Sequence, residues 1–353
     1  MGEKHMDFRS AEKLGFASDY MEGAHPEILR RLSETNFLKS PGYGMDDFSE
    51  TARDKIRQAC DAPGAEVYFL TGGTQTNAVV ISALLRSYQG VISADTGHIN
   101  GHEAGAIELG GHKVLTLPNR DGKITAEQLI TYQMAWWQDE NREHIVMPGM
   151  VYISQPTEQG TIYSLEELEA LSAVCRASDL PLYLDGARLA YALACPENDV
   201  TLQDIARLCD VFYIGGTKCG ALFGEAVVIP RFGLISGFFS IIKQHGALLA
   251  KGRIAGIQFE TLFTDDLYLK LGENAIRAAN RIRSVLKEKG YELAYENPTN
   301  QIFVVLSKDK AAELSDDVDL GFWENLDAER CIMRIATSWA TTDNDVDRLT
   351  ALL

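Results

Sequence analysis

The sequence lacks any apolar run near the roughly 20 residues that a membrane-spanning helix needs. It also opens with no basic segment followed by an apolar one, so no secretory leader is expected. Basic residues are scarce: 33 Lys and Arg stand against 50 Asp and Glu, a net charge of −17 at pH 7. Such a charge repels the phosphates of nucleic acids and of anionic lipids. We therefore expect a soluble, cytoplasmic protein that binds neither nucleic acid nor membrane.

Paired cysteines and nucleotide-binding loops are also missing. The six cysteines are scattered, with no Cys-x-x-Cys pair and no metal-like spacing: Cys60, Cys175, Cys195, Cys209, Cys219 and Cys331. We expect reduced thiols, several of them buried. The glycine-rich turn at 71–75 contains no G-x-G-x-x-G and is followed by no Gly-Lys-Ser/Thr, which excludes a dinucleotide fingerprint and a Walker loop there.

From Glu66 onward the chain alternates short apolar runs with amphipathic stretches. The apolar runs are VYFL, VISA, KVLTL, MVYISQ, PLYLD, VFYIGG and AVVIP, and the amphipathic stretches include TQTNAVVISALLRSY and SLEELEALSAVCRAS. This alternation is typical of strands joined by helical crossovers. It predicts an α/β fold with a mainly parallel central sheet and helices on both faces.

The pattern changes after Pro230. Helices are predicted from about Gly233 to Leu271 and from Glu273 to Lys289, followed by strands at IFVVLS and CIMRIAT and a closing helix at DNDVDRLTALL. The first fifty residues are polar and rich in turn residues, which favours an arm rather than a core. We expect three parts: an N-terminal arm (1–45), a large domain (46–250) and a smaller α+β domain (251–353).

Two ionisable side chains stand where open α/β sheets bind ligands. Asp185 ends the strand PLYLD just before Arg188, so an acid and a base lie at the carboxyl end of a strand. Lys218 lies on a glycine-flanked turn between two apolar strands, and a desolvated amine has a lowered pKa and is a good Schiff-base nucleophile. Taken alone, Asp185 is also consistent with a cap of the next helix. Lys218 is also consistent with a surface lysine beside a turn.

An anion site and a histidine segment precede this pair. The small residues at 71–75 open a helix, whose N–H groups and dipole favour a phosphate. After VISA, the spacing of His98, His102 and Glu103 is open to a metal site on one helix face. The order of the metalloprotease motif is absent, however, and we expect no metal. Stacking of His98 on a cofactor ring explains the segment better, and helix capping stays open for His102 and Glu103.

In this order, phosphate turn, histidine, strand-end aspartate and glycine-flanked lysine resemble the aspartate-aminotransferase-like, fold-type I family of pyridoxal-phosphate enzymes. Within that family the sequence is similar to the threonine aldolases of the β-eliminating lyase group. The likeness is carried by LTGGTQTN, HINGHEAGA, SQPTEQGTIYSLEEL, YLDGARLAYAL and YIGGTKCGALFGEAVV. Weaker similarity runs from FASDY to CIMRIATSWATTDNDVDRL, so the resemblance covers nearly the whole chain.

The resemblance implies how the chain would hold its cofactor. Lys218 would carry pyridoxal 5′-phosphate as a Schiff base, and Asp185 would pair with the ring nitrogen. Gly73, Thr74 and Gln75 would bind the phosphate.

It also implies contacts to the substrate and between subunits. Arg188 and Arg334 would grip the substrate carboxylate, joined by Ser18, because guanidinium groups bind carboxylates through two hydrogen bonds. The alternative for Arg334 is a charge on an edge strand. Arg188 would also lie against the cofactor. Tyr43 and Arg253 resemble residues that complete a neighbouring subunit's site, Arg253 by reaching the phosphate. A homodimer or homotetramer with shared active sites is therefore expected.

The group that handles the substrate's β-hydroxyl proton departs from the family pattern. Glu158, in Gln-Pro-Thr-Glu-Gln-Gly, stands where many threonine aldolases have a histidine. Burial raises the pKa of a carboxyl group toward working pH, so Glu158 remains a candidate base beside His98 and water. The arm segment also differs, reading Phe-Ala-Ser-Asp-Tyr in place of the commoner Leu-Arg-Ser-Asp-Thr.

The expected reaction is retro-aldol cleavage of L-threonine or L-allo-threonine to glycine and acetaldehyde. A β-eliminating lyase or racemase with the same cofactor is the alternative. A non-catalytic pyridoxal-phosphate-binding protein is more remote, because both Asp185 and Lys218 are retained. The sequence leaves open the threo, allo, L or D preference and the choice of dimer or tetramer.

Overall fold

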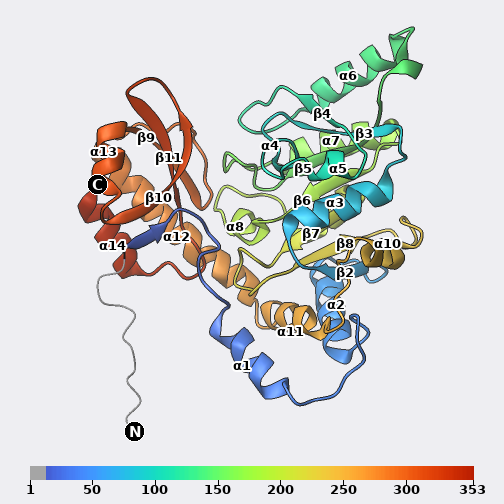
Figure 1. Cartoon of the computed structure of the whole chain (residues 1–353), viewed down its shortest axis with the longest axis horizontal. Helices are drawn as coiled ribbons and strands as arrows, with labels where there is room; N and C mark the ends of the chain where they lie inside the picture. Colours follow the sequence, from blue (N-terminus) through green and yellow to red (C-terminus); the bar gives the residue numbers. More distant parts are fainter. Residues whose placement is uncertain (1–12) are drawn as a thin grey trace.

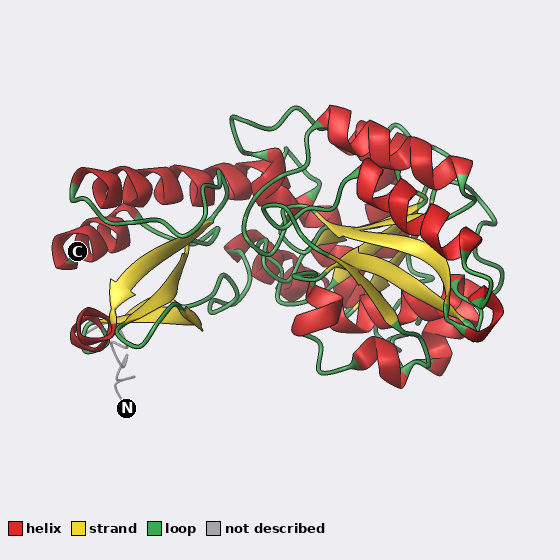
Figure 2. Ribbon diagram, turned by 90° about the horizontal axis from the view of Figure 1, so that it is seen from above, coloured by secondary structure: helices red, strands yellow, loops and turns green. Residues whose placement is uncertain are grey.

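The computed structural model describes residues 13–353 and has two lobes, which the helix α12 (Leu267–Glu288) connects (Figures 1 and 2). The larger lobe is built on a seven-stranded sheet and the smaller lobe on a four-stranded sheet. The predicted α/β fold with a smaller α+β part is confirmed.

The large sheet is mainly parallel. Its strands lie in the order β2 (Glu66–Leu70), β8 (Glu225–Ile229), β7 (Val211–Gly215), β6 (Leu182–Asp185), β5 (Met147–Ser154), β3 (Gln89–Ala94) and β4 (Val114–Leu117). Only β8 is antiparallel to its neighbours. Its first residue, Glu225, pairs with Leu70 and Gly215, the last residues of β2 and β7. The antiparallel strand therefore brings a carboxylate to the edge where the parallel strands end.

Helices cover both faces of this sheet. Successive strand residues point to opposite sides, so Val151 and Ile153 join one apolar cluster while Met150 and Tyr152 join the other. The first cluster includes residues of α2 (Asp47–Ala59), α6 (Ala126–Gln138), α7 (Leu165–Ala177), α9 (Leu202–Leu208) and α11 (Arg253–Leu262). The second includes residues of α3 (Gly73–Leu84), α5 (Ala106–Leu109) and α10 (Phe238–Gln244). A short 3-10 helix, η1 (Arg142–His144), leads into β5.

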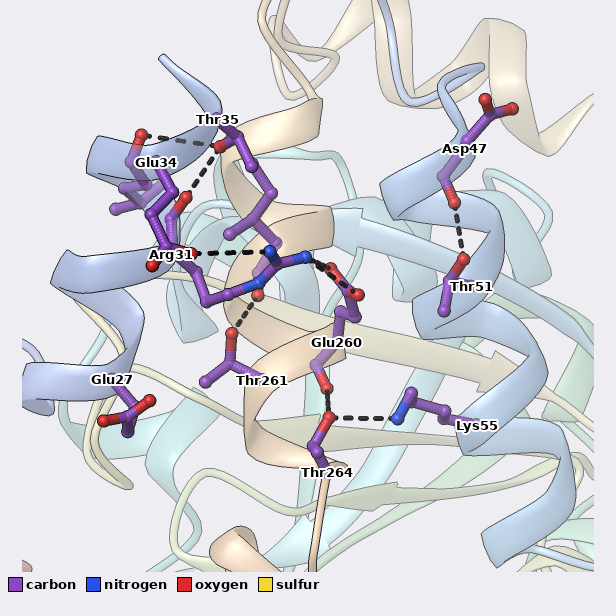
Figure 3. Close-up of polar contacts among 12 residues, drawn as sticks. Glu27, Arg31, Glu34, Thr35, Asp47, Thr51, Lys55, Glu260, Thr261 and Thr264 are labelled. Atoms are coloured by element: carbon purple, nitrogen blue, oxygen red, sulfur yellow. Dashed lines mark hydrogen bonds and ion pairs between the residues drawn. The ribbon is translucent and has the colours of Figure 1, made fainter. Parts of the chain in front are cut away.

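Helix α1 (Pro26–Thr35) packs on α11 of the large lobe (Figure 3). Nη2 of Arg31 lies 3.2 Å from each carboxylate oxygen of Glu260, and Nζ of Lys55 on α2 donates to Oγ1 of Thr264 at 2.9 Å. Such exposed or half-exposed pairs contribute about 0–1 kcal/mol each. Burial of Ile28 contributes more, about 1.5–3 kcal/mol for a fully buried side chain of this size.

The small lobe contains a strand from each end of the chain. Its strands lie in the order β1 (Leu14–Phe16), β10 (Val318–Asn325), β11 (Arg330–Ala336) and β9 (Gln301–Ser307). They pack with α12, α13 (Lys308–Leu314) and α14 (Asp343–Leu352). The predicted strands at IFVVLS and CIMRIAT and the closing helix are confirmed as β9, β11 and α14.

The segment expected to form an arm contributes to both lobes. Leu14 and Phe16 of β1 are 4% and 1% exposed in the small core, and α1 belongs to the large lobe. Residues 1–12 of that arm lie outside the described residues. The division of the chain at residues 45 and 250 stays a prediction.

The prediction of one continuous helix from Gly233 to Leu271 is wrong. The chain forms α10, α11 and the start of α12 there, separated at Gly246 (φ 67°) and at Asp265 and Asp266 (φ 51° and 56°). The break expected before Glu273 is also wrong, because Gly272 lies inside α12. A Cβ at Gly272 would stand 2.3 Å from the carbonyl oxygen of Ala190, so glycine allows close packing on α8 (Leu189–Leu193).

Within residues 13–353, none of the helices has the length and apolar character that a membrane crossing requires. All six cysteines are free and buried, as predicted.

Candidate active site

A cavity of about 350 Å³ opens at the edge where the parallel strands of the large sheet end. Its volume falls in the range of about 300–1,000 Å³ typical of small-molecule sites. Seven of the predicted site residues line it: Gly73, Thr74, His98, Glu158, Asp185, Arg188 and Lys218. The lining also includes residues that the sequence did not single out, among them Tyr20, Ser154, Tyr213, Thr217 and Glu225.

Asp185, the last residue of β6, is buried and surrounded by donors. Its Oδ1 accepts a hydrogen bond from the Tyr213 hydroxyl at 2.5 Å, and its Oδ2 accepts from the Tyr152 hydroxyl at 2.7 Å and from Nδ2 of Asn77 at 3.0 Å. Burial alone would raise the pKa of Asp185, but the nearby His98 and these three hydrogen bonds outweigh burial and lower it. The carboxylate is therefore held in its ionised form.

Lys218 lies on the turn between β7 and β8, with its carbonyl oxygen held by the Tyr191 hydroxyl at 2.5 Å. Its Nζ stands 5.9 Å from the centroid of the Tyr20 ring. Burial, followed by the positive charge of Arg188, lowers the pKa of Lys218. The amine is therefore more readily deprotonated than an ordinary lysine, as a nucleophile requires.

Glu225, at the start of β8, adds a second carboxyl group beside Lys218. It is 3% exposed, and its Oε2 accepts a hydrogen bond from the backbone N–H of Gly216 at 3.0 Å. Burial raises the pKa of Glu225 to about 8, although the Thr217 side chain and the Lys218 ammonium favour the charged form.

The turn after β2 exposes the amino end of α3 to the cavity. Gly72 precedes the helix and has no side chain with which to cap it, so backbone N–H groups of the first turn are free to bind an anion. A Cβ at Gly73 would stand 3.1 Å from the Tyr213 hydroxyl, so glycine keeps this approach open. Gln75 is not among the lining residues, and its Oε1 accepts hydrogen bonds from Thr71.

His98 begins α4 (His98–Gly101) at the end of β3 and lies next to Glu158. The backbone N–H of His98 donates to Oε1 of Glu158 at 3.0 Å, and the Ser154 hydroxyl donates to the same oxygen at 2.7 Å. Nδ1 of His98 lies 2.7 Å from Oε1 of Glu103. Burial raises the pKa of Glu158 more than its hydrogen bonds lower it. Glu158 therefore binds a proton more readily than an ordinary glutamate, as a group that exchanges a proton requires.

Arg188 is fixed by a residue from the N-terminal segment. Its Nε and Nη2 donate to the two carboxylate oxygens of Asp19 at 2.6 and 3.0 Å, and Nδ2 of Asn300 donates to the same carboxylate at 2.9 Å. Burial alone would raise the pKa of Asp19, but Arg188 and then Lys218 lower it to about 2. This ion pair joins the large lobe, the small lobe and the segment after β1.

Arg334 lies on β11 and faces the same region from the small lobe. Its Nη2 donates to the carbonyl oxygen of Ala17 at 2.7 Å, and its guanidinium carbon stands 5.9 Å from the centroid of the Trp323 ring. Burial and the charge of Arg188 lower its pKa. Neither Arg334 nor the half-buried Ser18 is among the residues that line the cavity.

Tyr43 and Arg253 lie away from the cavity of their own chain. Tyr43 lines a second cleft of about 540 Å³, where Nζ of Lys243 stands 4.3 Å from its ring. The guanidinium of Arg253 donates to the carbonyl oxygen of Thr35 at 2.8 Å and to that of Leu38.

The alternative of a metal site finds no support among the described residues. Within residues 13–353, no group of three or more His, Cys, Asp or Glu side chains is arranged to hold a metal ion. The ring of His102 instead lies between those of His98 and Trp323, at 5.7 and 5.8 Å.

Several functional contacts had weak or no signals in the sequence. Glu225 is the one with a usable signal, since a charged residue opens the otherwise apolar strand EAVVI. Asp19 and Asn300 are 281 residues apart, and nothing local in either segment indicates that they meet.

The residues present fit pyridoxal 5′-phosphate. The cavity combines a carboxylate held in its ionised form, a lysine with a lowered pKa and an uncapped helix start. These groups match a pyridinium nitrogen, an aldehyde carbon and a phosphate.

Comparisons with known proteins agree with this chemistry. The β-eliminating lyase family matches residues 15–309. The chain is 31% identical to the low specificity L-threonine aldolase of Pseudomonas aeruginosa over 299 residues, which are 83% of this chain and 84% of that protein.

Solved structures show the same relationship. A threonine aldolase of Leishmania major is 44% identical, with a TM-score of 0.92 over 96% of this chain and 98% of the other. An aspartate aminotransferase mutant of Thermus thermophilus, 14% identical with a TM-score of 0.71 over 98% and 92%, shares the fold and so confirms the predicted aminotransferase-like architecture. Because the family match spans most of the chain, and the Pseudomonas relative exceeds 30% identity over most of it, the chain belongs to the β-eliminating lyase family.

Proposed function

We propose that the chain is a pyridoxal-5′-phosphate enzyme that cleaves the Cα–Cβ bond of β-hydroxy-α-amino acids, converting L-threonine or L-allo-threonine to glycine and acetaldehyde. The observation that carries the proposal is the meeting of Lys218, Asp185 and Glu158 in one cavity. The names of the similar Pseudomonas and Leishmania enzymes support the same reaction.

Four groups would hold the cofactor. Lys218 would bind it covalently, Asp185 would pair with its ring nitrogen, the N–H groups of residues 73–75 would bind its phosphate, and His98 would lie against its ring. When bound, the cofactor supplies an electron sink for the electron pair left at Cα as the Cα–Cβ bond breaks. Asp185 is suited to a protonated ring nitrogen because three donors keep it ionised.

Arg188 and Arg334 would bind the α-carboxylate of the substrate, joined by Ser18. Asp19 occupies Nε and Nη2 of Arg188, which fixes the plane of the guanidinium and leaves Nη1 for the substrate. A fixed carboxylate sets which bond at Cα is aligned for cleavage.

Glu158 would accept the proton of the β-hydroxyl, with His98 and a bound water as the other candidates. Oε1 of Glu158 is engaged by Ser154 and by the backbone of His98, which leaves Oε2 for the proton. The raised pKa of Glu158 suits a base that later returns the proton.

The second candidate function is β-elimination on a related amino acid, and the same residue favours it. A buried Glu158 with a raised pKa can hold a proton, and a protonated carboxyl group can act as the general acid that expels hydroxide after Cα–H removal. The products would then be a keto acid and ammonia.

Product analysis separates the two reactions. The protein is incubated with L-threonine and L-allo-threonine, and acetaldehyde, glycine, 2-oxobutanoate and ammonia are quantified. Acetaldehyde and glycine in equal amounts from either threonine isomer are expected. Keto acid and ammonia without aldehyde would contradict aldol cleavage and support the lyase.

The functional unit would be a closed symmetric assembly in which a second copy covers the face around Tyr43 and Arg253. Large apolar side chains gather there: Met45, Phe232 and Phe239 line the same cleft as Tyr43 and are 69%, 81% and 42% exposed. An exposed apolar patch is typical of an interface between subunits. Light scattering should give a dimer or tetramer, and a fully active monomer would refute shared sites.

A further inference from the structure

A buried hydrogen-bonded bridge links Asp185 to His98 through the side chains of Asn77 and Glu103. Nδ2 of Asn77 donates to Oδ2 of Asp185 at 3.0 Å and to Oε1 of Glu103 at 2.7 Å. Oδ1 of Asn77 accepts a hydrogen bond from the Tyr183 hydroxyl at 2.8 Å, which fixes the orientation of the amide. One amide therefore joins two carboxylates.

A buried carboxylate oxygen of Glu103 faces one ring nitrogen of His98. Its Oε1 lies 2.7 Å from Nδ1 of His98, and its side chain is fully buried. A carboxylate oxygen accepts a hydrogen bond when Nδ1 carries the proton, so this contact favours the Nδ1-protonated ring. In the neutral ring, Nε2 is then unprotonated and available as an acceptor or base.

The charge of Glu103 has no structural use that the described residues reveal. Its Oε2 is buried without a hydrogen-bond partner among residues 13–353. Its side chain caps no helix: α5 begins after Gly105, and only the backbone carbonyl of Glu103 accepts a hydrogen bond there. A buried carboxylate with one oxygen lacking a hydrogen-bond partner lowers the stability of the fold, and an apolar residue of similar size would lower it less. The two contacts that this carboxylate does make, with Nδ1 of His98 and Nδ2 of Asn77, indicate where it acts.

We propose that Glu103 is a positioning residue, which holds His98 with Nδ1 protonated, and that Asn77 extends this bridge to Asp185. The two groups expected to face the cofactor ring are thereby oriented by one network. The proposal rests on the proposed function only in assuming that the cavity binds pyridoxal 5′-phosphate. The hydrogen bonds of the bridge do not depend on that assumption. The helix-capping role left open for Glu103 is replaced by this one.

The first test reads the protonation of His98 directly. The full-length protein, labelled with ¹⁵N-histidine, is examined before and after addition of pyridoxal 5′-phosphate, and His98 is assigned by its loss in His98→Asn. In the unmodified protein Nδ1 should carry the proton. In Glu103→Leu the acceptor is gone, and the neutral ring should switch to the Nε2-protonated form. Glu103→Gln restores an acceptor oxygen and should restore the original form.

A matched control is Glu143→Leu, an exposed glutamate next to His144 on η1, which should leave the His98 signals unchanged. If His98 gives the same ¹⁵N shifts in Glu103→Leu as in the unmodified protein, the positioning role is overturned. This readout needs no turnover, so it stands apart from failure of the proposed reaction. If Glu103→Leu does not fold, the Asn77→Ala variant described below still tests whether the bridge affects Asp185.

The second test addresses the Asn77 side of the bridge. Asn77→Ala removes one donor from Asp185 and leaves the Glu103–His98 contact in place. Cofactor affinity, measured by fluorescence titration of the full-length apoprotein, should fall about tenfold, as expected for loss of one hydrogen bond to a charged group. The His98 ¹⁵N shifts should stay as they are. Unchanged cofactor affinity would show that the hydrogen bond from Asn77 does not affect Asp185. It would refute the claim that Asn77 extends the bridge to Asp185.

In kinetic assays, Glu103→Leu should lower kcat by about 10- to 100-fold, by analogy with the loss seen when the hydrogen-bond partners of metal-ligating histidines are removed. KM should change little, because Arg188 and Arg334 keep their contacts. A rise in KM with unchanged kcat would contradict positioning of His98.

Discussion

Replacing Glu225 by glutamine is expected to flatten the pH dependence of stability. An ordinary glutamate has a pKa of about 4.5, and burial raises that of Glu225 to about 8 in the folded chain. Between these values the native state holds a proton that the unfolded state has lost. The free energy of unfolding therefore falls as pH rises through this window, and the stability associated with protonated Glu225 is fully present only below about pH 4.5.

The magnitude follows from the two pKa values. One pKa unit corresponds to about 1.4 kcal/mol, so the contribution lost between pH 4.5 and 8 is on the order of 5 kcal/mol. Glutamine is neutral throughout and keeps an oxygen that can accept the Gly216 N–H. Between pH 5.5 and 7.5, Glu225→Gln should gain about 3 kcal/mol relative to the unmodified protein.

Urea unfolding of the apoprotein at pH 5.5 and 7.5, followed by tryptophan fluorescence at fixed protein concentration, measures this difference. The apoprotein is used because bound cofactor adds its own stabilisation. Glu273→Gln, the same chemical change at an exposed position of α12, is the control and should shift stability equally at both pH values. If the pH profiles of Glu225→Gln and the unmodified protein run parallel, the argument from burial is refuted.

Three further variants probe the cavity. Borohydride reduction followed by mass spectrometry should find the cofactor on Lys218 alone, and Lys218→Ala should give a colourless protein without the adduct; an adduct on another lysine would disprove the assignment. Asp185→Asn should still bind cofactor but lose about 10²- to 10³-fold in kcat, as for other removed electrostatic groups, and near-normal turnover would exclude its role. Asp19→Asn leaves Arg188 buried without its anion and should cost about 3–5 kcal/mol of stability. The ion pair itself should weaken only as pH falls from about 3.8 toward the Asp19 pKa of about 2, which acid titration of unfolding in both proteins can check.

The sequence was informative wherever a signal is local. The apolar runs PLYLD and VFYIGG became buried strands of the large sheet, because strands covered on both faces must be apolar throughout. The run VYFL became its half-buried edge strand. Asp185 ends one of these strands and Lys218 comes three residues after another, so their meeting at one edge could be expected from topology.

Other parts of the fold and of the site depend on contacts between residues far apart in the sequence, which no local sequence pattern indicates. β1 is three residues long, too short for an alternation to be read, and it is a strand only because Val318–Leu320 pairs with it. Helical propensity around Gly233–Leu271 suggested one helix, yet left-handed residues at Asp265 and Asp266 divide it. The bidentate hold of Asp19 on Arg188 was missed for the same reason, since 169 residues separate them.

The triple contact at Asp19 has a consequence for biosynthesis. Asp19 bonds to Arg188 and to Asn300, which follow it by 169 and 281 residues. At about 5–20 residues per second, a nascent chain makes Asn300 roughly 15–60 s after Asp19. The large sheet can therefore be complete on the ribosome before Asn300 is available to hold Asp19, the partner of Arg188. The complete set of contacts to Asp19 therefore forms only after Asn300 has been synthesised.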